Sequence, residues 1–340
     1  MSESEFDIIK NYFHLNGGSS HQPDWPEWLD TGIGDDAAIL NTAPFNSSQA
    51  EQQLIAVDTL NAGIHFLEDT SPADIGYKAL AVNVSDIAAM GGQPLWFTLA
   101  ISLPKIDHDW LKDFSTGLSE MANQHAIKLI GGDTTSGPLS ITIQIAGKVP
   151  AQQALKRSGA RPGDDIYVTG SLGDGAAALS LLQQGDKKIN AYQQTLIDRL
   201  HRPTPRVNVG IAIRKHASAC IDISDGLAGD LGHILASSSP EANKLGAELH
   251  LDRIPLSESL QQSGLAVEKQ QALALHGGDD YELCFTAPQS ERLAIEMISQ
   301  QSECPISNIG TIIEEQGLYI IDKEQRIAIT ETGFDHFAKS

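Results

Sequence analysis

Acidic residues recur in short loops of this chain, and most of these loops contain glycine. They are Asp35 and Asp36 after Gly32-Ile33-Gly34, Asp58 after an apolar run, Asp133 after Gly131-Gly132, Asp222 and Asp225 around Ser224, and Asp279 and Asp280 after Gly277-Gly278. Glycine lets a ligand approach the backbone closely, and aspartate is a short carboxylate suited to divalent cations that prefer oxygen ligands. We therefore expect a site that binds magnesium ions.

The chemistry expected of such a site follows from its charge. Clustered carboxylates repel one another in a low-dielectric site, so they need cations. The chain has 23 Lys and Arg against 44 Asp and Glu, a formal charge of −21. A protein this acidic can hold a polyphosphate where metal ions bridge carboxylate and phosphate oxygens. The pattern favours nucleotide-dependent phosphoryl transfer, and a non-catalytic acidic metal-binding protein is the alternative.

Other motifs give weaker indications. The chain has no GxxxxGK[ST], HRD or DFG motif, and its histidines lack a paired zinc spacing. The glycine-rich segment Gly170–Gly175 has GxxGxG spacing, so a nicotinamide oxidoreductase rests on that loose match alone, and a tight strand-to-helix turn is the competing interpretation. Arg157 could lie over phosphates, and His65 follows Asp58 closely enough to face the same site.

Length and composition bound the class of protein. With 340 residues, the chain is long enough for two domains, and 41% hydrophobic residues with 30 Gly and 15 Pro are typical of a folded, loop-rich protein. The negative charge argues against nucleic-acid and membrane-surface partners. Three cysteines without CxxC spacing, an acidic N-terminus and the absence of an 18-residue apolar run predict a soluble cytoplasmic protein.

Alternating helical and strand patterns predict an α/β or α+β architecture. In the first half we expect a helix over Phe6–Phe13, a buried strand over Leu54–Val57 that ends at Asp58, a helix that begins at Ser71-Pro72 and stops at Gly91-Gly92, a strand over Ile127–Ile130 that ends at Gly131-Gly132-Asp133, and a strand over Ile141–Ile145. Asp86 falls on the apolar stripe of the second helix, so it needs either a partner or solvent at the last turn.

The pattern restarts near Val149-Pro150, which divides the chain into domains over residues 1–149 and 150–340. In the second domain we expect a turn at Arg161–Asp164, strands over Ile166–Val168, Cys220–Ile223, Tyr281–Phe285 and Leu318–Ile321, and a helix capped by Ser224 that runs toward Leu235.

Six motifs in order, within a stretch from about Phe6 to Phe337, resemble the thiamine-monophosphate kinase family. They are Gly32-Ile33-Gly34-Asp35-Asp36-Ala37-Ala38, Val57-Asp58-Thr59-Leu60 with Gly63-Ile64-His65-Phe66, Tyr77-Lys78-Ala79-Leu80-Ala81-Val82-Asn83-Val84-Ser85-Asp86, Gly131-Gly132-Asp133-Thr134-Thr135, Asp222-Ile223-Ser224-Asp225-Gly226-Leu227 and Gly277-Gly278-Asp279-Asp280-Tyr281-Glu282-Leu283. One motif alone would be weak, whereas six in order are specific.

The resemblance implies transfer of the γ-phosphoryl group of ATP to thiamine monophosphate, the last step of thiamine diphosphate biosynthesis. It also implies the two-domain fold of aminoimidazole ribonucleotide synthetase (PurM-like), with an N-terminal α/β domain that makes a homodimer through its sheet, a C-terminal α/β domain, and ATP with several Mg²⁺ ions between them. The positions that match metal ligands are Asp36, Asp58, Asp86, Asp133, Asp222 and Asp225. Those that match nucleotide contacts are Gly132, Asp133, Arg157 and Ser224, and those that match contacts to thiamine phosphate are His65, Asp279 and Phe334.

This chain departs from the family pattern at two motifs. Ala56 and Val57 stand where the family commonly has hydroxyl residues, and Asp279 stands where it has Glu. An aromatic side chain at Phe334 could stack on a thiamine ring, although ordinary packing would also explain it.

The resemblance also bears on mechanism. The acceptor phosphate is already ionised, so direct in-line transfer needs no general base, and a phospho-aspartate intermediate is the alternative. Within the fold, a ligase-like or selenophosphate-forming enzyme is the other candidate. A selenophosphate-forming enzyme would be expected to have a reactive cysteine near its N-terminal glycine-rich loop, whereas the first cysteine here is Cys220.

Overall fold

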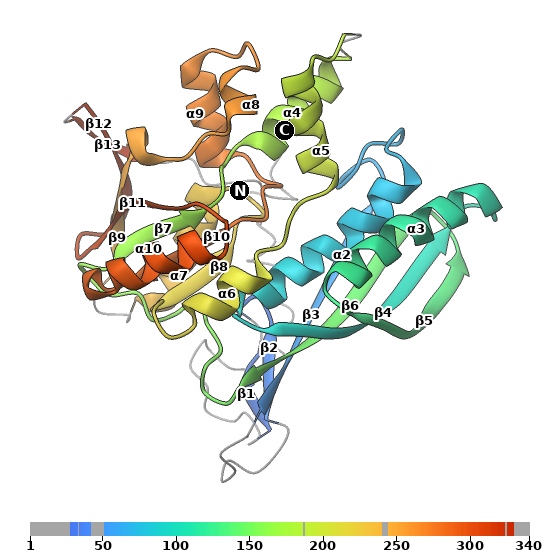
Figure 1. The fold of residues 1–340 in the computed structure, drawn as a ribbon, viewed down its shortest axis with the longest axis horizontal. Coiled ribbons are helices and arrows are strands. Elements are labelled where there is room, and N and C mark those ends of the chain that lie inside the picture. The colour runs from blue at the N-terminus through green and yellow to red at the C-terminus, as the bar shows by residue number, and fades with distance from the viewer. Residues whose placement is uncertain are drawn as a thin grey trace, which may run out of the picture.

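The computed structural model describes residues 28–32, 34–41, 51–185, 188–239, 244–323 and 325–329. The helix expected over Phe6–Phe13 and the expected substrate contact Phe334 lie outside these residues. The described chain forms two sheets, one from each half of the sequence, with helices packed against them (Figure 1). This arrangement confirms the predicted mixed α/β architecture. No described helix combines the length and the apolar character needed to cross a membrane.

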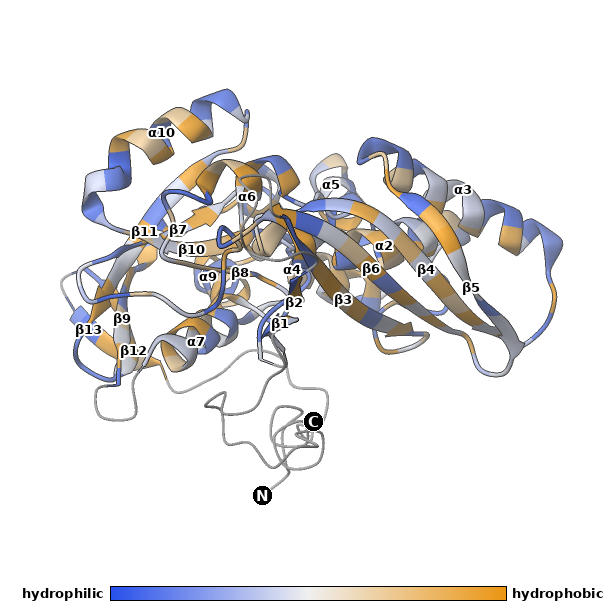
Figure 2. Cartoon of the chain, turned by 90° about the horizontal axis from the view of Figure 1, so that it is seen from below, coloured by the Kyte–Doolittle hydropathy of each residue, from blue (hydrophilic) through white to orange (hydrophobic). Residues whose placement is uncertain are grey.

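The first half forms a six-stranded sheet in the order β1-β2-β3-β6-β4-β5. Only β4 and β5 pair in parallel, and the other described pairs are antiparallel. The strands are β1 (Leu29–Thr31), β2 (Ala38–Asn41), β3 (Glu51–Asn61), β4 (Gln93–Leu103), β5 (Lys128–Ser136) and β6 (Ser140–Pro150). Helices α2 (Pro72–Ala89) and α3 (His108–Gln124) cover one face of this sheet, whereas Figure 2 shows no helix in front of the other face of β3, β6, β4 and β5.

The second half forms a seven-stranded sheet in the order β13-β12-β9-β11-β7-β10-β8. Its strands are β7 (Asp165–Thr169), β8 (Ala219–Asp222), β9 (Gly246–His250), β10 (Leu283–Ala287), β11 (Ile306–Ile313), β12 (Gly317–Asp322) and β13 (Gln325–Ile329). Its helices are α4 (Asp174–Gln184), α5 (Ala191–His201), α6 (Val207–Ile213), α7 (Leu227–Ser238), α8 (Glu258–Gln261), α9 (Val267–His276) and α10 (Arg292–Gln301). The apolar core of the first half continues into the second, where it includes Cys220 and Phe285.

Helix α2 is the central element of the molecule. Its start is as predicted, because Ser71 accepts a hydrogen bond from the Asp74 amide and Pro72 occupies the first turn. It ends at Ala89, before Gly91, whose φ of +65° turns the chain. The helix packs against α3, β3 and β6 in its own half and against α6 and β8 in the other half. It is therefore buried on nearly all sides, rather than along the single stripe that periodicity predicted.

Two strand predictions were too short. Asp58 lies inside β3, which continues to Asn61 because it pairs with β6 over its full length. This strand is not uniformly buried, since Val57 is 60% exposed on the uncovered face. Likewise, Gly131-Gly132-Asp133 lies inside β5, because the pairing with β4 continues to Ser136. Pairing partners override the low strand propensity of Asp and Gly at these positions.

The predicted cap at Ser224 was wrong. Helix α7 begins at Leu227 with Gly226 as its N-cap residue, whose φ is +114°. The carboxylate of Asp230, in the first turn of the helix, accepts hydrogen bonds from the amides of Asp225 and Gly226 at 3.1 Å each. Asp230 therefore satisfies the amides that precede the helix, and Ser224 belongs to the loop between β8 and α7.

Candidate active site

Three aspartates from distant parts of the chain meet between the two halves. Asp36 precedes β2, Asp86 lies in the last turn of α2, and Asp222 ends β8. One carboxylate oxygen from each lies within 4.8 Å of the other two. Asp36 and Asp222 are buried, with 8% and 5% of their surface exposed. Three carboxylates this close are held most favourably by a bound cation.

Asp36 is held by a cation of the chain. Arg157 Nη2 and Nε donate to Asp36 Oδ1 at 2.5 Å and 3.1 Å. The other oxygen, Oδ2, is buried and has no hydrogen-bond partner among the described residues. A buried carboxylate oxygen without a donor is unfavourable in a folded protein. The donor set and this orphaned oxygen fit a divalent cation with oxygen ligands.

The end of helix α2 positions the neighbouring acids. Ser85 Oγ donates to Asp222 Oδ2 at 2.6 Å, and the Asp58 amide donates to Asn83 Oδ1 at 3.2 Å. The side chains of Asn83 and Ser85 are fully buried. One turn of α2 thus supplies Asp86 itself and a hydrogen bond to each of two other acidic residues.

Burial and mutual repulsion raise the pKa values of these acids. The pKa of Asp86 lies well above its ordinary value because the carboxyl is buried and faces Asp58, Asp222 and Asp36. Burial, with the charge of Asp36, raises the pKa of Asp222 to about 8 and that of Asp35 to about 7. Charged groups without enough compensating cation produce such shifts. The proximity of Asp58 to Asp86 also places Asp58 at the margin of the cluster.

Asp225 lies close to the cluster on the loop after β8. Asp230 holds this loop by accepting hydrogen bonds from two of its amides. Burial and the charges of Asp225 and Asp222 raise the pKa of Asp230 well above its ordinary value. Asp225 is half-buried and is not one of the three clustered acids. It stands three residues after Asp222, the last residue of β8.

Gly132 and Asp133 lie elsewhere in the same subunit. The strand register aligns Gly132 with Leu99, Ile143 and Asp58 across the sheet, and a Cβ on Gly132 would come within 1.9 Å of Leu99 O. Asp133 is the next residue, so it points to the opposite, uncovered face. Three strand spacings, about 14 Å, also separate β5 from β3. The structure therefore does not bring Asp133 to the acidic cluster within one chain.

Two predicted contacts to the acceptor, His65 and Asp279, lie together beside Lys78 of α2. His65 Nδ1 accepts from the Asn61 amide at 3.0 Å. Asp279 Oδ1 lies 2.6 Å from Lys78 Nζ, and the Asp279 amide donates to Ser224 O at 2.9 Å. The loop that carries Asp279 thus contacts both α2 and the loop after β8.

Five residues of this region were not assigned a role from the sequence. They are Lys78, Asn83, Ser85, Asp230 and Tyr281. Lys78, Asn83, Ser85 and Asp230 are polar side chains inside otherwise apolar helical segments, whereas Tyr281 stands between acidic residues. For the four helical residues that contrast was the available signal, since a polar group on a buried face needs a partner.

The glycine-rich turn Gly170–Gly175 is a structural turn. Its amides at Gly173 and Gly175 donate to the two oxygens of buried Asp280, at 2.7 Å and 3.3 Å. Asp174, in the same turn, pairs with Arg199 at 2.7 Å. Because these amides are already bonded to a carboxylate, they are not available to a dinucleotide phosphate. The structure removes the basis for the oxidoreductase alternative.

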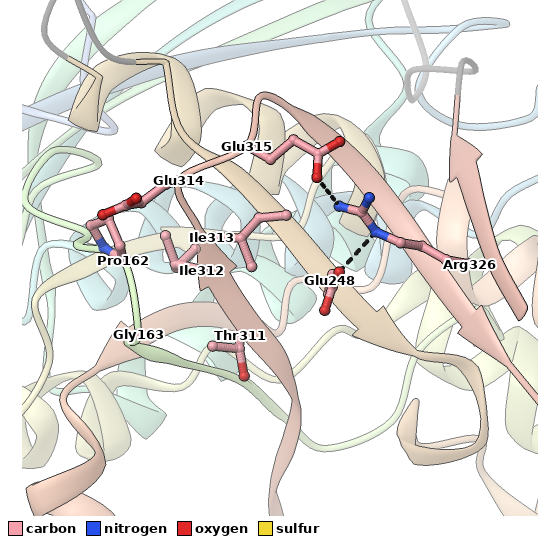
Figure 3. Close-up of a pocket in the computed structure, with 9 residues that line it drawn as sticks. All are labelled: Pro162, Gly163, Glu248, Thr311, Ile312, Ile313, Glu314, Glu315 and Arg326. Atoms are coloured by element: carbon pink, nitrogen blue, oxygen red, sulfur yellow. Dashed lines mark hydrogen bonds and ion pairs between the residues drawn. The ribbon is translucent and has the colours of Figure 1, made fainter. Parts of the chain in front are cut away.

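A surface hollow of about 740 Å³ lies far along the second sheet, at the end of β11 (Figure 3). The residues that line it are Pro162, Gly163, Glu248, Thr311, Ile312, Ile313, Glu314, Glu315 and Arg326. Arg326 is paired with Glu248 and Glu315 at 2.8 Å each. None of the predicted site residues lines this hollow, so it is separate from the candidate active site.

Comparisons with known proteins identify the family of the chain. The family model for the AIR synthase related protein N-terminal domain matches residues 34–149, and that for its C-terminal domain matches residues 161–323. The chain is 46% identical over 346 residues to thiamine-monophosphate kinase of Salmonella typhimurium and 44% identical over 344 residues to that of Escherichia coli, with 99% of each chain covered in both cases.

Solved structures give the same result. The crystal structure of thiamine-monophosphate kinase from Stenotrophomonas maltophilia K279a has a TM-score of 0.76 and 43% identity, covering 94% of this chain and 97% of that one. The structure of AaThiL complexed with AMPPCP and TMP has a TM-score of 0.80 and 28% identity, covering 98% and 97%.

Proposed function

The chain belongs to the AIR synthase related family as one of its thiamine-monophosphate kinases, and from this membership we propose that it transfers the γ-phosphoryl group of ATP directly to thiamine monophosphate, using Mg²⁺ held by its clustered aspartates. The single observation that carries the metal part of this proposal is the meeting of Asp36, Asp86 and Asp222 within 4.8 Å. The ATP analogue and TMP in the AaThiL structure support the choice of substrates.

The metal-holding residues follow from position and charge. Asp36, Asp86 and Asp222 would form the inner set, with the orphaned Asp36 Oδ2 aimed at an ion. Asp58 and Asp225 would bind at the margin, where they are half-buried. When bound, Mg²⁺ neutralises charge on the ATP phosphates and on the transferred group.

The chain's own residues then align the two substrates. An oxygen of the acceptor phosphate forms a bond to the γ-phosphorus of ATP while the bond from γ-phosphorus to the ADP oxygen breaks. The acceptor phosphate is already ionised near neutral pH, so no side chain needs to remove a proton from it. Arg157 and Ser85 hold Asp36 and Asp222 in place for this alignment. We place Arg157 and Ser224 beside the nucleotide, and His65 and Asp279 beside the acceptor.

We also propose a homodimer formed through the first sheet. Strand β5 is an edge strand whose residues are all exposed, and Val57, Leu129 and Ile130 are apolar residues that are 52–60% exposed on that sheet. An exposed edge strand is a template for pairing with another chain, and exposed apolar patches mark interaction sites. A second copy would also explain why Gly132 and Asp133 lie away from the acidic cluster of their own chain, because Asp133 could then serve the site of the partner.

The proposal also covers the domain boundary, the route of phosphoryl transfer and the location of the protein in the cell. We place the domain boundary at residues 149 and 150, where β6 ends and the linker to β7 begins. A phospho-aspartate intermediate would retain configuration at a chiral γ-phosphorus, whereas direct transfer inverts it, so stereochemical analysis decides between them. We propose a cytoplasmic location because ATP is the phosphoryl donor, and cell fractionation tests it.

The activity is tested by incubating the protein with Mg-ATP and thiamine monophosphate and measuring thiamine diphosphate. Free thiamine serves as the control acceptor, and the variant D198N, at an exposed position on α5, serves as the matched control for D222N. We expect product with the wild type and D198N, and a loss of at least about 100-fold with D222N. ATP hydrolysis without product, or preferential use of free thiamine, would overturn the proposal.

A further inference from the structure

We propose that Lys78 is a positioning residue of the acceptor subsite, which together with the Tyr281 hydroxyl orients Asp279 toward the organic part of the acceptor. This inference rests on the proposed function, because it assumes that Asp279 contacts the acceptor. It assigns a role to a lysine and a tyrosine that are not among the expected ligands of metal, nucleotide or acceptor.

Lys78 is a buried lysine with few partners. It lies in α2, is 3% exposed, and places its ammonium 2.6 Å from Asp279 Oδ1 and 3.4 Å from His65 O. Burying an ammonium is unfavourable unless it is paired, so the position needs a specific benefit. Both partners belong to segments that are expected to contact the acceptor. Lys78 thus ties the two segments to the helix that carries Asp86.

The Asp279 loop is held in an unusual conformation. Asp279 has φ of +68° and Tyr281 has φ of +51°, which are disfavoured for residues with a side chain. The Tyr281 hydroxyl donates to Asp279 Oδ1 at 3.2 Å, the same oxygen that pairs with Lys78. Backbone conformations of this kind persist where surrounding contacts over-determine them, and they are concentrated at functional sites.

The other two acids of this loop are already engaged in the interior. Asp280 accepts from the amides of Gly173 and Gly175, and Glu282 accepts from Arg199, Arg206 and Thr169 at 2.5–2.9 Å. Asp280 and Glu282 are only 5% and 1% exposed. They anchor the loop on both sides of Tyr281, whereas the Asp279 side chain keeps 28% of its surface exposed.

Asp279 is therefore the carboxylate of this loop that can meet a ligand. Among the described residues, its side-chain interactions use only Oδ1, so Oδ2 can accept from a donor on the acceptor. Thiamine monophosphate offers an aminopyrimidine donor and a thiazolium cation, and a fixed carboxylate suits either. Lys78 and Tyr281 would fix that carboxylate without touching the transferred phosphoryl group.

The variants K78M and Y281F test this role by steady-state kinetics in both substrates. We expect K78M to raise KM for thiamine monophosphate by about tenfold or more, the effect of losing a charged hydrogen bond. We expect KM for ATP to change by less than about twofold, and K78R, which keeps the charge, to recover part of the loss. Y281F should show a smaller effect in the same direction.

A double-mutant cycle separates positioning from general destabilisation. If Lys78 acts through Asp279, K78M should add little to the acceptor KM of D279N. The control is R202M, which breaks a neighbouring contact between the halves, from Arg202 to Asp74 and Glu120, without touching Asp279. R202M should leave the acceptor KM near the wild-type value.

The outcomes distinguish this inference from the proposed function. A wild type that makes no thiamine diphosphate refutes the proposed function. An active wild type with an unchanged acceptor KM in K78M refutes the role of Lys78. So do additive effects of K78M and D279N, or equal increases in KM for both substrates.

Discussion

Ser85 Oγ on helix α2 donates a 2.6 Å hydrogen bond to Asp222 Oδ2 at the end of strand β8, and this bond joins the two halves of the molecule inside the acidic cluster. Both residues are buried, with 0% and 5% of their surface exposed. The hydroxyl occupies one lone pair of Oδ2 and fixes the direction in which the carboxylate faces Asp36 and Asp86.

Replacing Ser85 by alanine should reduce turnover while the protein still folds. S85A removes the hydroxyl that orients a proposed metal ligand, and loss of such an orienting partner lowers metal affinity or activity about 10–100-fold. The measurement is kcat and the Mg²⁺ concentration for half-maximal activity. S115A is the control, since the Ser115 hydroxyl bonds the Lys112 carbonyl on an exposed face of α3. Equal kinetics in S85A and the wild type would contradict the orienting role.

The stability of the metal-free protein should fall as pH rises. The pKa of Asp222 is raised from 3.8 to about 8, because it is buried beside Asp36. Between these values the folded state holds more protons than the unfolded state, so the free energy of unfolding decreases with rising pH. The stabilising contribution of protonated Asp222 is complete below the pKa that this group has in the unfolded state. It is lost once the pH rises through the pKa that the group has in the folded state.

Thermal unfolding with chelator at about pH 6 and about pH 8.5 measures this trend. We expect the wild type to unfold at a lower temperature at the higher pH, and added Mg²⁺ to stabilise it most there, where the carboxylates are ionised. D222N should show a smaller pH effect. A metal-free wild type that gains stability over this range would show that these acids are ionised in the fold.

Replacing Asp230 by alanine should weaken both the fold and the metal loop. The Asp230 carboxylate is 2% exposed and accepts from the amides of Asp225 and Gly226. Leaving a buried amide without an acceptor costs about 1–3 kcal/mol. Urea unfolding should show a lower midpoint, and the Mg²⁺ requirement should increase. D230N keeps an oxygen in place and should be milder, whereas a D230A protein with wild-type midpoint and Mg²⁺ requirement would refute the role.

Mixing two inactive variants tests whether Asp133 acts in the site of a partner. In the homodimer that we propose, D133N and D86N subunits would combine to give one intact site and one doubly altered site. After joint refolding of equal amounts, about a quarter of the sites should be active. The measurement is thiamine diphosphate formation by the mixture against each variant alone. No recovery, with a mixed dimer demonstrated by mass spectrometry, would exclude this arrangement. Full activity of D133N alone would remove Asp133 from the site.

The sequence allowed the acidic residues to be found but not the way they are arranged. Asp36 follows a glycine-rich loop, Asp222 stands at the end of an apolar segment and Asp86 falls on the apolar stripe of a helix, which are local signals. Their meeting within 4.8 Å depends on packing between the two halves, which no local pattern contains. The opposite holds for Asp133, whose motif looks like the others although the strand register turns it to the uncovered face.

Local propensity also failed where pairing partners decided the outcome. Strands β3 and β5 continue through Asp58 and through Gly131-Gly132, because neighbouring strands supply hydrogen bonds along their full length. Ser224 has the side chain of a helix cap, yet α7 begins only at Leu227 and has no side-chain cap, while Asp230 in its first turn accepts from the loop amides that precede the helix. Both failures arise from contacts between residues whose partners could not be identified from spacing alone.

Helix α2 fixes the distance between two parts of the candidate site. Lys78 and Asp86 are eight residues apart on one buried helix, so the axial distance between them is about 12 Å. Lys78 contacts the segments expected to recognise the organic part of the acceptor, and Asp86 lies at the proposed phosphoryl-transfer centre. Because a packed helix cannot stretch, the separation between Lys78 and Asp86 is fixed. A phosphate ester whose ring system lies nearer to or farther from its phosphate would therefore reach only one of these two regions at a time.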